Sequence, residues 1–109
     1  MATMKRDEVV KHLGISDDNL TVLVANSLII MDQNSEFPMF QFNREALDLE
    51  VIVAYKILSK SPLSTEKIIE WFINHNAVLD AVPCEYIKVH GGDEFIRAAV
   101  SSAIDIASL

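Results

Sequence analysis

The hydrophobic and polar positions of this chain recur mostly with the period of an α-helix. Apolar residues fall on one side of the segment Lys5–Leu13, which predicts a short helix that ends at Gly14. Ser16 is a typical N-cap residue for a second helix over Asp17–Asn26. Two short helices joined by a glycine-bearing turn form the pattern of a helix-turn-helix, although any small pair of packed helices produces the same pattern.

Two short apolar runs follow, Leu28–Met31 and Phe37–Phe42, with a polar segment between them. β-prone runs on either side of a polar turn predict a hairpin, in which Phe40 and Phe42 would share one face. A hairpin that follows directly after a helix-turn-helix is a wing. We therefore expect residues 1–42 to form a helix-turn-helix with a β-hairpin wing.

Helical periodicity resumes after the second apolar run and continues to the end of the chain. Residues 43–109 are expected to form a helical domain of about four helices. The predicted fold class is mainly α, with an N-terminal helix-turn-helix and a small β-hairpin wing packed on a compact C-terminal helical bundle. The expected helix starts are Leu47, Ser64 or Thr65, Pro83 and, after Gly91–Gly92, Asp93 as the cap of the last helix.

Composition and charge narrow the range of functions. The chain has 109 residues, half of them hydrophobic, which suits one domain or two very small ones that share a core. Lys and Arg number 9 against 16 Asp and Glu, so the net charge is −7. A nucleic-acid binder usually carries a basic footprint, and the chain as a whole has none. An acidic surface suits a basic protein partner, or it serves only solubility.

Features of export, membranes and reactive sites are missing from the sequence. No apolar run approaches the length of a membrane span, and no apolar stretch follows the basic residues at the N-terminus, so we expect a cytoplasmic protein. The single cysteine, Cys84, and the three histidines, His12, His75 and His90, lack the spacing of a helical metal pair. We therefore expect no catalytic residues, no metal, no cofactor and no enzymatic activity.

The helix-turn-helix pattern nevertheless supplies candidate DNA-binding side chains. Contacts to phosphates and base edges need basic, amide or hydroxyl groups. The second helix also carries Asp17 and Asp18 at its start, where they would repel phosphates. The candidates are Lys5, Arg6 and Lys11 on the first helix and Asn19, Thr21 and Asn26 on the second.

Four segments from Phe37 onward occur in a recognisable order: Phe37–Phe42, Ile69–Phe72, Asn74–Leu79 and Pro83–Ile87. Together they resemble the aromatic-Pro-x-Phe-Gln-Phe run, the tryptophan-bearing helix, the proline-and-asparagine turn followed by leucine, and the Pro-x-x-Leu-Leu segment of the toxin-binding domain of Xre/MbcA/ParS-type antitoxins. With the preceding helix-turn-helix, the resemblance covers roughly residues 5–109. The leucine pair of that last segment is replaced here by Tyr86-Ile87, and the second helix lacks the basic residues common in the family.

This resemblance implies a protein with two roles. The C-terminal domain would bind and block a cognate toxin, often an enzyme that degrades or modifies NAD, and the N-terminal unit would bind the operon's promoter and repress it. A homodimer is expected, with toxin and operator DNA as its partners. The segment after Pro83 is expected to be partly exposed, so its polar and aromatic side chains are our candidates for the partner surface: Glu85, Tyr86, Lys88 and His90.

Two alternatives remain open at this stage. The chain could be a stand-alone winged helix-turn-helix transcriptional regulator without a toxin, although the weakly basic second helix argues against this. It could also be a degenerate protein borne on a phage or genomic island, which uses the scaffold only for protein contacts.

Overall fold

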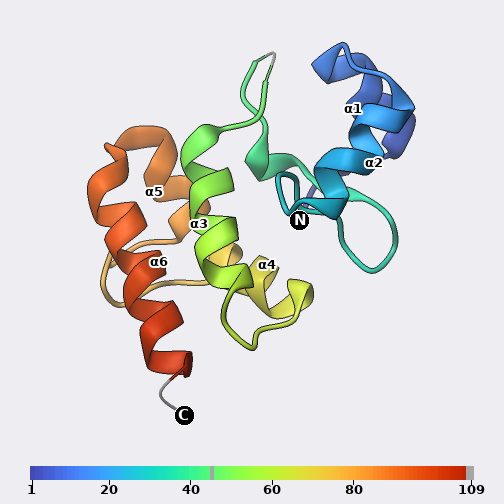
Figure 1. Ribbon diagram of the computed structural model, residues 1–109. Coiled ribbons are helices and arrows are strands. Elements are labelled where there is room, and N and C mark those ends of the chain that lie inside the picture. Colours follow the sequence, from blue (N-terminus) through green and yellow to red (C-terminus); the bar gives the residue numbers. More distant parts are fainter. Residues whose placement is uncertain (45, 108–109) are drawn as a thin grey trace.

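In the computed structural model, which describes residues 1–44 and 46–107, those residues form six α-helices and one small antiparallel sheet of two strands (Figure 1). The mainly α prediction is therefore confirmed. Figure 1 shows α1 and α2 together at one end of the molecule and α3 to α6 grouped at the other. The elements are β1 Thr3–Met4, α1 Arg6–Leu13, α2 Asp17–Ala25, β2 Phe37–Pro38, the 3₁₀ turn η1 Met39–Gln41, α3 Leu49–Ser59, α4 Thr65–Ile73, α5 Pro83–Val89 and α6 Gly92–Ala107.

The local signals at the helix ends act as the sequence predicts. Gly14 ends α1 in the left-handed conformation, with φ of 66°, which costs a glycine little. The Ser16 hydroxyl accepts a hydrogen bond from the Asn19 backbone N–H at 3.1 Å and so caps α2. Ser64 caps α4 in the same way by accepting from the Lys67 N–H at 3.2 Å. These short-range bonds explain why helix positions could be predicted within about two residues.

The predicted hairpin wing is wrong. Leu28–Met31 contains no strand, and the segment Phe37–Pro38 pairs instead with Thr3–Met4 at the N-terminus. The chain then turns into η1, so the second half of the predicted strand is not extended. Pro38 has no N–H to give to a ladder, which limits the sheet to its short observed length.

The side chain of Gln41 explains how the first apolar run, Leu28–Met31, is held in position although it forms no strand. Its Oε1 accepts from the backbone N–H of Ile30 at 2.7 Å, and its Nε2 donates to the carbonyls of Ile30 and Pro38 at 2.8 and 3.0 Å. Gln41 is 1% exposed. Because this amide satisfies both backbone groups of Ile30, that buried residue needs no strand partner.

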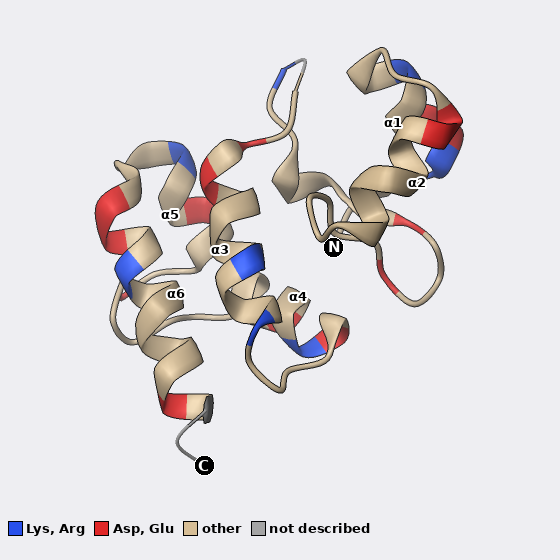
Figure 2. Ribbon diagram, viewed as in Figure 1, with Lys and Arg blue, Asp and Glu red and all other residues tan. Residues whose placement is uncertain are grey.

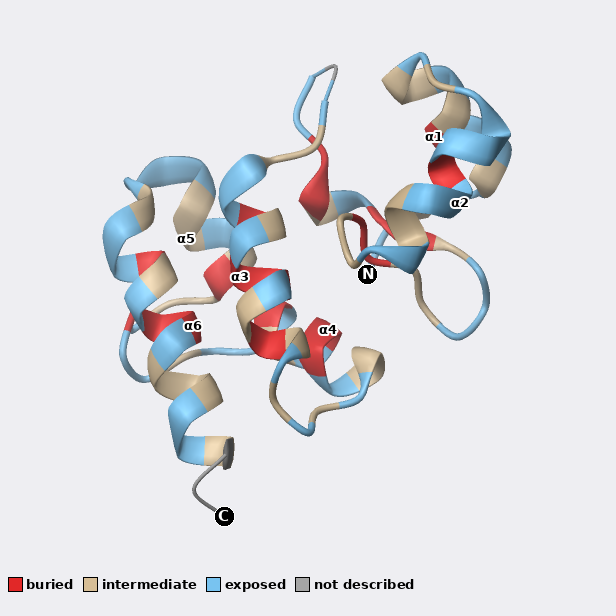
Figure 3. Ribbon diagram, viewed as in Figure 1, coloured by how far each residue is buried: buried red, intermediate tan, exposed pale blue. Residues whose placement is uncertain are grey.

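The 3₁₀ turn also separates the two aromatic residues that were expected to share a face. Phe42 is buried with the N-terminal helices, whereas Phe40 packs against the C-terminal bundle. In the same way, Ile29 is buried with the N-terminal helices and Ile30 with the C-terminal bundle. Figure 3 shows buried positions in both parts of the molecule. Because these neighbouring residues are divided between the two clusters, the segment that connects α2 to α3 belongs to both cores. The N-terminal core consists of Val9, Leu20, Ile29, Phe37 and Phe42.

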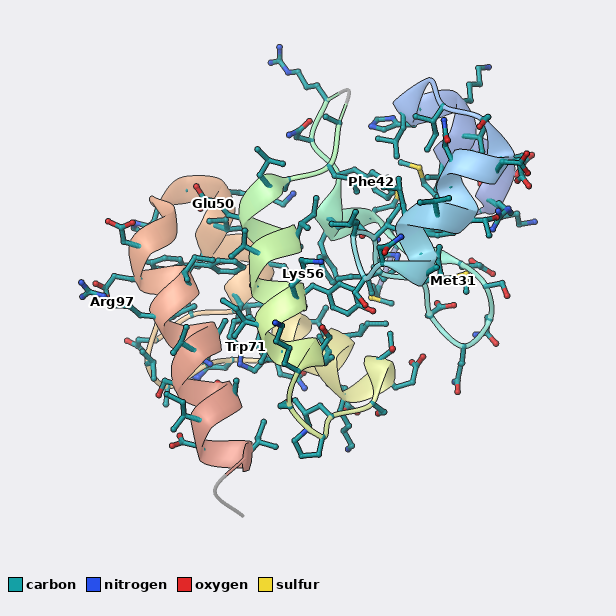
Figure 4. All side chains as sticks on the ribbon, viewed as in Figure 1. Met31, Phe42, Glu50, Lys56, Trp71 and Arg97 are labelled. Atoms are coloured by element: carbon teal, nitrogen blue, oxygen red, sulfur yellow. The ribbon has the colours of Figure 1, made fainter. Side chains whose placement is uncertain are left out.

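The C-terminal core is built around aromatic rings from three elements. Phe72 of α4 lies between Phe40 and Phe95, with ring centroids 5.0 and 6.2 Å away. Trp71, labelled in Figure 4, packs edge-on against Phe72 and Phe95 and donates from Nε1 to the Ser102 hydroxyl of α6 at 2.8 Å. This bond satisfies the one polar atom of the indole where α4 meets α6.

The last helix begins at Gly92, one residue before the position that was expected to be its cap. A Cβ at Gly92 would collide with the carboxylate of Glu50, which lies directly against this residue from the first turn of α3. The starts of α3 and α6 are therefore adjacent.

Candidate partner-binding groove

An open groove of about 440 Å³ lies where the N-terminal arm crosses the C-terminal bundle. It lies between the N-terminal arm, defined here as Met1–Ala2, and three parts of the remaining chain: η1, the last residue of α4 and the first turn of α5. Its lining residues are Met1, Ala2, Met39, Phe40, Ile73, Val82, Cys84 and Glu85.

The groove is apolar, and its apolar side chains reach solvent. Met1 is 62% exposed, Met39 44% and Ile73 36%. Among the residues that line the groove, Glu85 has the single charged side chain. Flexible methionines beside a carboxylate can adapt to an apolar side chain that carries a positive charge nearby.

Two of the four segments that carry the predicted resemblance contribute residues to this groove, and Ile73 lies between the other two. Met39 and Phe40 come from the aromatic run, Ile73 follows the tryptophan-bearing segment, and Cys84 and Glu85 belong to the segment that begins at Pro83. The sequence did not single out Met39 or Ile73, since apolar residues at these positions also suit a core. Their exposure depends on the way η1 and α4 end beside the N-terminal arm.

The four predicted partner residues lie on different sides of α5. Glu85 lines the groove. Tyr86 turns toward the bundle and stacks on His90, with ring centroids 4.4 Å apart and planes inclined by 25°. Lys88 is exposed and does not line the groove. The structure thus brings Glu85 to the groove and pairs Tyr86 with His90 elsewhere on the helix.

Two of the predicted DNA-binding residues are bound to each other and to a carboxylate. The Nε of Arg6 donates to Asp17 Oδ1 at 2.6 Å, and its Nη2 donates to the Asp17 carbonyl at 3.0 Å and to the Thr21 hydroxyl. Thr21 in turn donates to the Asp17 carbonyl at 3.3 Å. The guanidinium of Arg6 is therefore engaged within the protein, and its charge is compensated.

The four remaining predicted DNA-binding residues are all exposed. Lys5 and Lys11 are exposed on α1, and Lys11 lines an open cleft of about 530 Å³ beside Glu8 and His12. Asn26 donates from Nδ2 to the Val22 carbonyl at 2.8 Å, so its amide completes the end of α2. Asn19 is exposed.

The exposed face of α2 carries no basic side chain. Its central positions, spaced by four and then three residues, are Asp18, Val22 and Ala25, and all three are exposed. Figure 2 shows acidic residues in red beside the basic ones on the outer side of α1 and α2. A carboxylate and two aliphatic side chains supply neither phosphate contacts nor base-edge donors.

Reactive chemistry is weak in the described part of the chain. Burial, and secondarily the nearby charge of Glu85, raises the pKa of the Cys84 thiol, which favours the less reactive protonated form. Among residues 1–44 and 46–107, no cluster of three His, Cys, Asp or Glu side chains is arranged to hold a metal ion. No helix in the same ranges is long and apolar enough to cross a membrane.

The chain matches no protein-family model, no curated protein and no solved structure.

Proposed function

We propose that this chain is an antitoxin-like protein that binds a cognate toxin enzyme and inhibits it by covering its active site. The observation that carries the proposal is the meeting of two segments with antitoxin resemblance, Phe37–Phe42 and Pro83–Ile87, at one exposed apolar groove. An apolar centre beside a charged rim is the usual anatomy of a protein interface. The net charge of −7 suits a toxin whose active-site cleft is basic.

The groove provides one anchor point of a larger contact. A stable complex usually buries about 800 Å² on each partner, which is more than the groove alone offers. We place Met39 and Ile73 at the centre of the contact and Glu85 at its rim, where the carboxylate would meet a basic group of the toxin. Apolar residues at the centre of an interface generally contribute most of its binding energy.

The experiment is co-expression with the product of the neighbouring gene, followed by growth measurement and co-purification. We expect the neighbour to stop growth when expressed alone and to be silent and bound when this chain is present. Met39→Glu would place a charge in the groove and weaken both rescue and complex formation at least tenfold. Val22→Glu is the matched control, because Val22 is 55% exposed on α2, far from the groove residues in the sequence and outside its lining.

A toxic neighbour that is neither bound nor silenced by this chain would contradict the proposal. Equal loss of binding in Met39→Glu and Val22→Glu would contradict the location of the contact. Circular dichroism of each variant shows whether it is folded. Glu85→Lys provides a second, exposed substitution at the groove that leaves the apolar packing in place.

A second candidate function is operator binding by the α1–α2 unit, either as autorepression or in a stand-alone regulator. The observation in favour is the arrangement itself, two helices joined by a short turn with Lys5 and Lys11 exposed on the first. A gel shift on the upstream DNA at low salt tests it. We expect Lys5→Glu with Lys11→Glu to abolish any shift and to leave the toxin complex intact, and the absence of any shift by the unmodified protein would remove this function.

A further inference from the structure

The groove between the N-terminal arm and the bundle holds most of the sulfur-bearing side chains of this protein. The chain has four methionines and one cysteine. Three of these side chains, those of Met1, Met39 and Cys84, line the groove. Thioethers suit an adaptable contact surface, but they are also apolar groups that oxidants convert to polar ones.

Met39 is the methionine that combines exposure with a fixed place in the groove. It is 44% exposed, whereas Met4 and Met31 are partly buried and pack against the N-terminal core. The backbone of Met39 is held on both sides, because its N–H donates to the Ala2 carbonyl at 2.9 Å and its carbonyl accepts from the Phe42 N–H at 3.1 Å. An oxidised side chain at this position would therefore stay at the groove.

The thiol of Cys84 is a poorer target for an oxidant. It is partly buried against the core of the bundle, and burial, followed by the charge of Glu85, raises the pKa of the thiol. Peroxides attack the thiolate form of cysteine, so both effects lower the reactivity of Cys84. The thioether of Met39 is open to solvent and needs no deprotonation.

We propose that Met39 is a site of reversible oxidation by peroxides and that its sulfoxide switches the groove off as a binding surface. The effect on binding rests on the proposed function, in which the groove contacts the toxin. The sulfur lone pair attacks the outer oxygen of the peroxide and the O–O bond breaks. The proton of that oxygen passes to the leaving oxygen, which departs as water or an alcohol. The sulfur loses two electrons and the peroxide gains them. A methionine sulfoxide reductase, with a thiol as electron donor, returns the thioether and water.

The groove offers little to a sulfoxide oxygen, which accepts hydrogen bonds and cannot donate them. The Glu85 carboxylate also only accepts, and the Cys84 thiol is a weak donor. The remaining lining side chains are hydrocarbons and the thioether of Met1. A toxin that covered the oxidised groove would bury an oxygen without a donor from this chain, so we expect binding to weaken at least about tenfold.

The first test uses the full chain alone. Dilute hydrogen peroxide is added, and peptide mass mapping follows the gain of one oxygen at each methionine with time. We expect Met39 to be oxidised faster than Met4 and Met31, with an unchanged circular dichroism spectrum because Met39 is exposed. Equal rates at the three positions, or a slower rate at Met39, would overturn the assignment of the site.

The second test measures binding of the neighbouring gene product, which is itself kept from the peroxide. Met39→Leu retains an apolar side chain that peroxide cannot oxidise, so this variant should bind equally well before and after treatment. Met31→Leu is the matched control at a methionine outside the groove, and it should lose binding after treatment as the unmodified protein does. Incubation of the oxidised protein with methionine sulfoxide reductase should restore binding.

Loss of binding by treated Met39→Leu would overturn the proposal and assign the sensitivity to Met1 or Cys84, which Cys84→Ala would separate. Unchanged binding by the oxidised, unmodified protein would also overturn it. Failure of the untreated protein to bind the neighbouring product would contradict the proposed function and with it the switch. The order of oxidation in the first test would still decide whether Met39 is the modification site.

Discussion

The N-terminal unit of α1, α2 and the small sheet and the C-terminal bundle of α3 to α6 obey the same local rules but depend on cores of different sizes. The bundle encloses stacked aromatic rings around Phe72 and packs its longest helix, α6, along α3. The N-terminal helices contribute only Val9 and Leu20 as fully buried residues, and the segment after them supplies Ile29, Phe37 and Phe42. The small unit therefore depends on the connecting segment for its core.

The two regions also use charge differently. In the N-terminal unit, Arg6 of α1 is bonded to Asp17 and Thr21 of α2, and α2 carries no basic side chain. In the bundle, the ion pairs Lys67–Glu70 and Glu94–Arg97 each link residues three apart on one helix. The comparison teaches that a helix-turn-helix outline does not by itself establish a DNA-binding surface, since intramolecular contacts can occupy its polar side chains.

The largest expected effect is on the bundle. Phe72→Ala removes a fully buried ring between Phe40 and Phe95 and leaves a cavity, which should lower the free energy of unfolding by about 3–5 kcal/mol. Urea denaturation followed by Trp71 fluorescence and by circular dichroism measures the loss. A decrease below about 1 kcal/mol would show that the aromatic cluster is not the centre of the core.

Leu20→Ala makes the corresponding cavity in the N-terminal core, where we expect a loss of about 2–5 kcal/mol. If the two regions differ as described, this loss appears first as faster hydrogen exchange of amides in α1 and α2, while the amides of α3 and α4 stay protected. Simultaneous loss of protection in all four helices would mean that the two cores unfold as one unit.

Gln41→Leu tests the link between the regions. The substitution leaves the buried N–H and carbonyl of Ile30 without the side-chain amide, which should cost about 1–3 kcal/mol in the free energy of unfolding. Gln33→Leu is the matched control, because Gln33 is exposed, and it should change the stability by less than about 0.5 kcal/mol. Equal effects of the two variants in urea denaturation would contradict the structural role of Gln41.

Arg6→Met removes an ion pair between partly exposed groups, whose side chains are 38% and 68% exposed. Solvent screens such pairs, so we expect a loss of no more than about 1 kcal/mol, smaller still at high salt. Thermal unfolding at low and high ionic strength measures it. A larger, salt-independent loss would show that Arg6 is a packing element of the N-terminal unit.

The smallest effect is expected where α3 meets α6. Gly92 does not have a positive φ, so Gly92→Ala should stabilise the helix start by about 0.4–1 kcal/mol once the Glu50 carboxylate is removed by Glu50→Ala. With Glu50 present, the new methyl group must displace the carboxylate, and the gain should be smaller. The unmodified protein, the two single variants and the double variant form a double-mutant cycle. Their melting temperatures measure the coupling between Gly92 and Glu50, which would be zero if the two residues were not in contact.

The helices and their ends could be predicted from the sequence because their causes are local. Gly14, Ser16 and Ser64 act on backbone groups within four residues of themselves, so their roles follow from chain position alone. The hairpin could not be predicted correctly, because the competitor for the first apolar run is the side chain of Gln41 and the partner of Phe37–Pro38 is the N-terminal strand, 33 or more residues away in the sequence. β-Prone composition does not identify the partner of a strand.

The candidate site residues also divide into those that the sequence predicts and those that depend on distant segments. Glu85 was predicted from the sequence as a partner residue, but Met39 and Ile73 were not, because exposure of an apolar side chain depends on how distant segments end beside it. The sequence by itself determined the helices, their caps and the net charge of −7, which follow from residue identity and short-range backbone chemistry. Tertiary structure decided which charges are already compensated and which apolar residues reach solvent, because both depend on contacts between residues far apart in the chain.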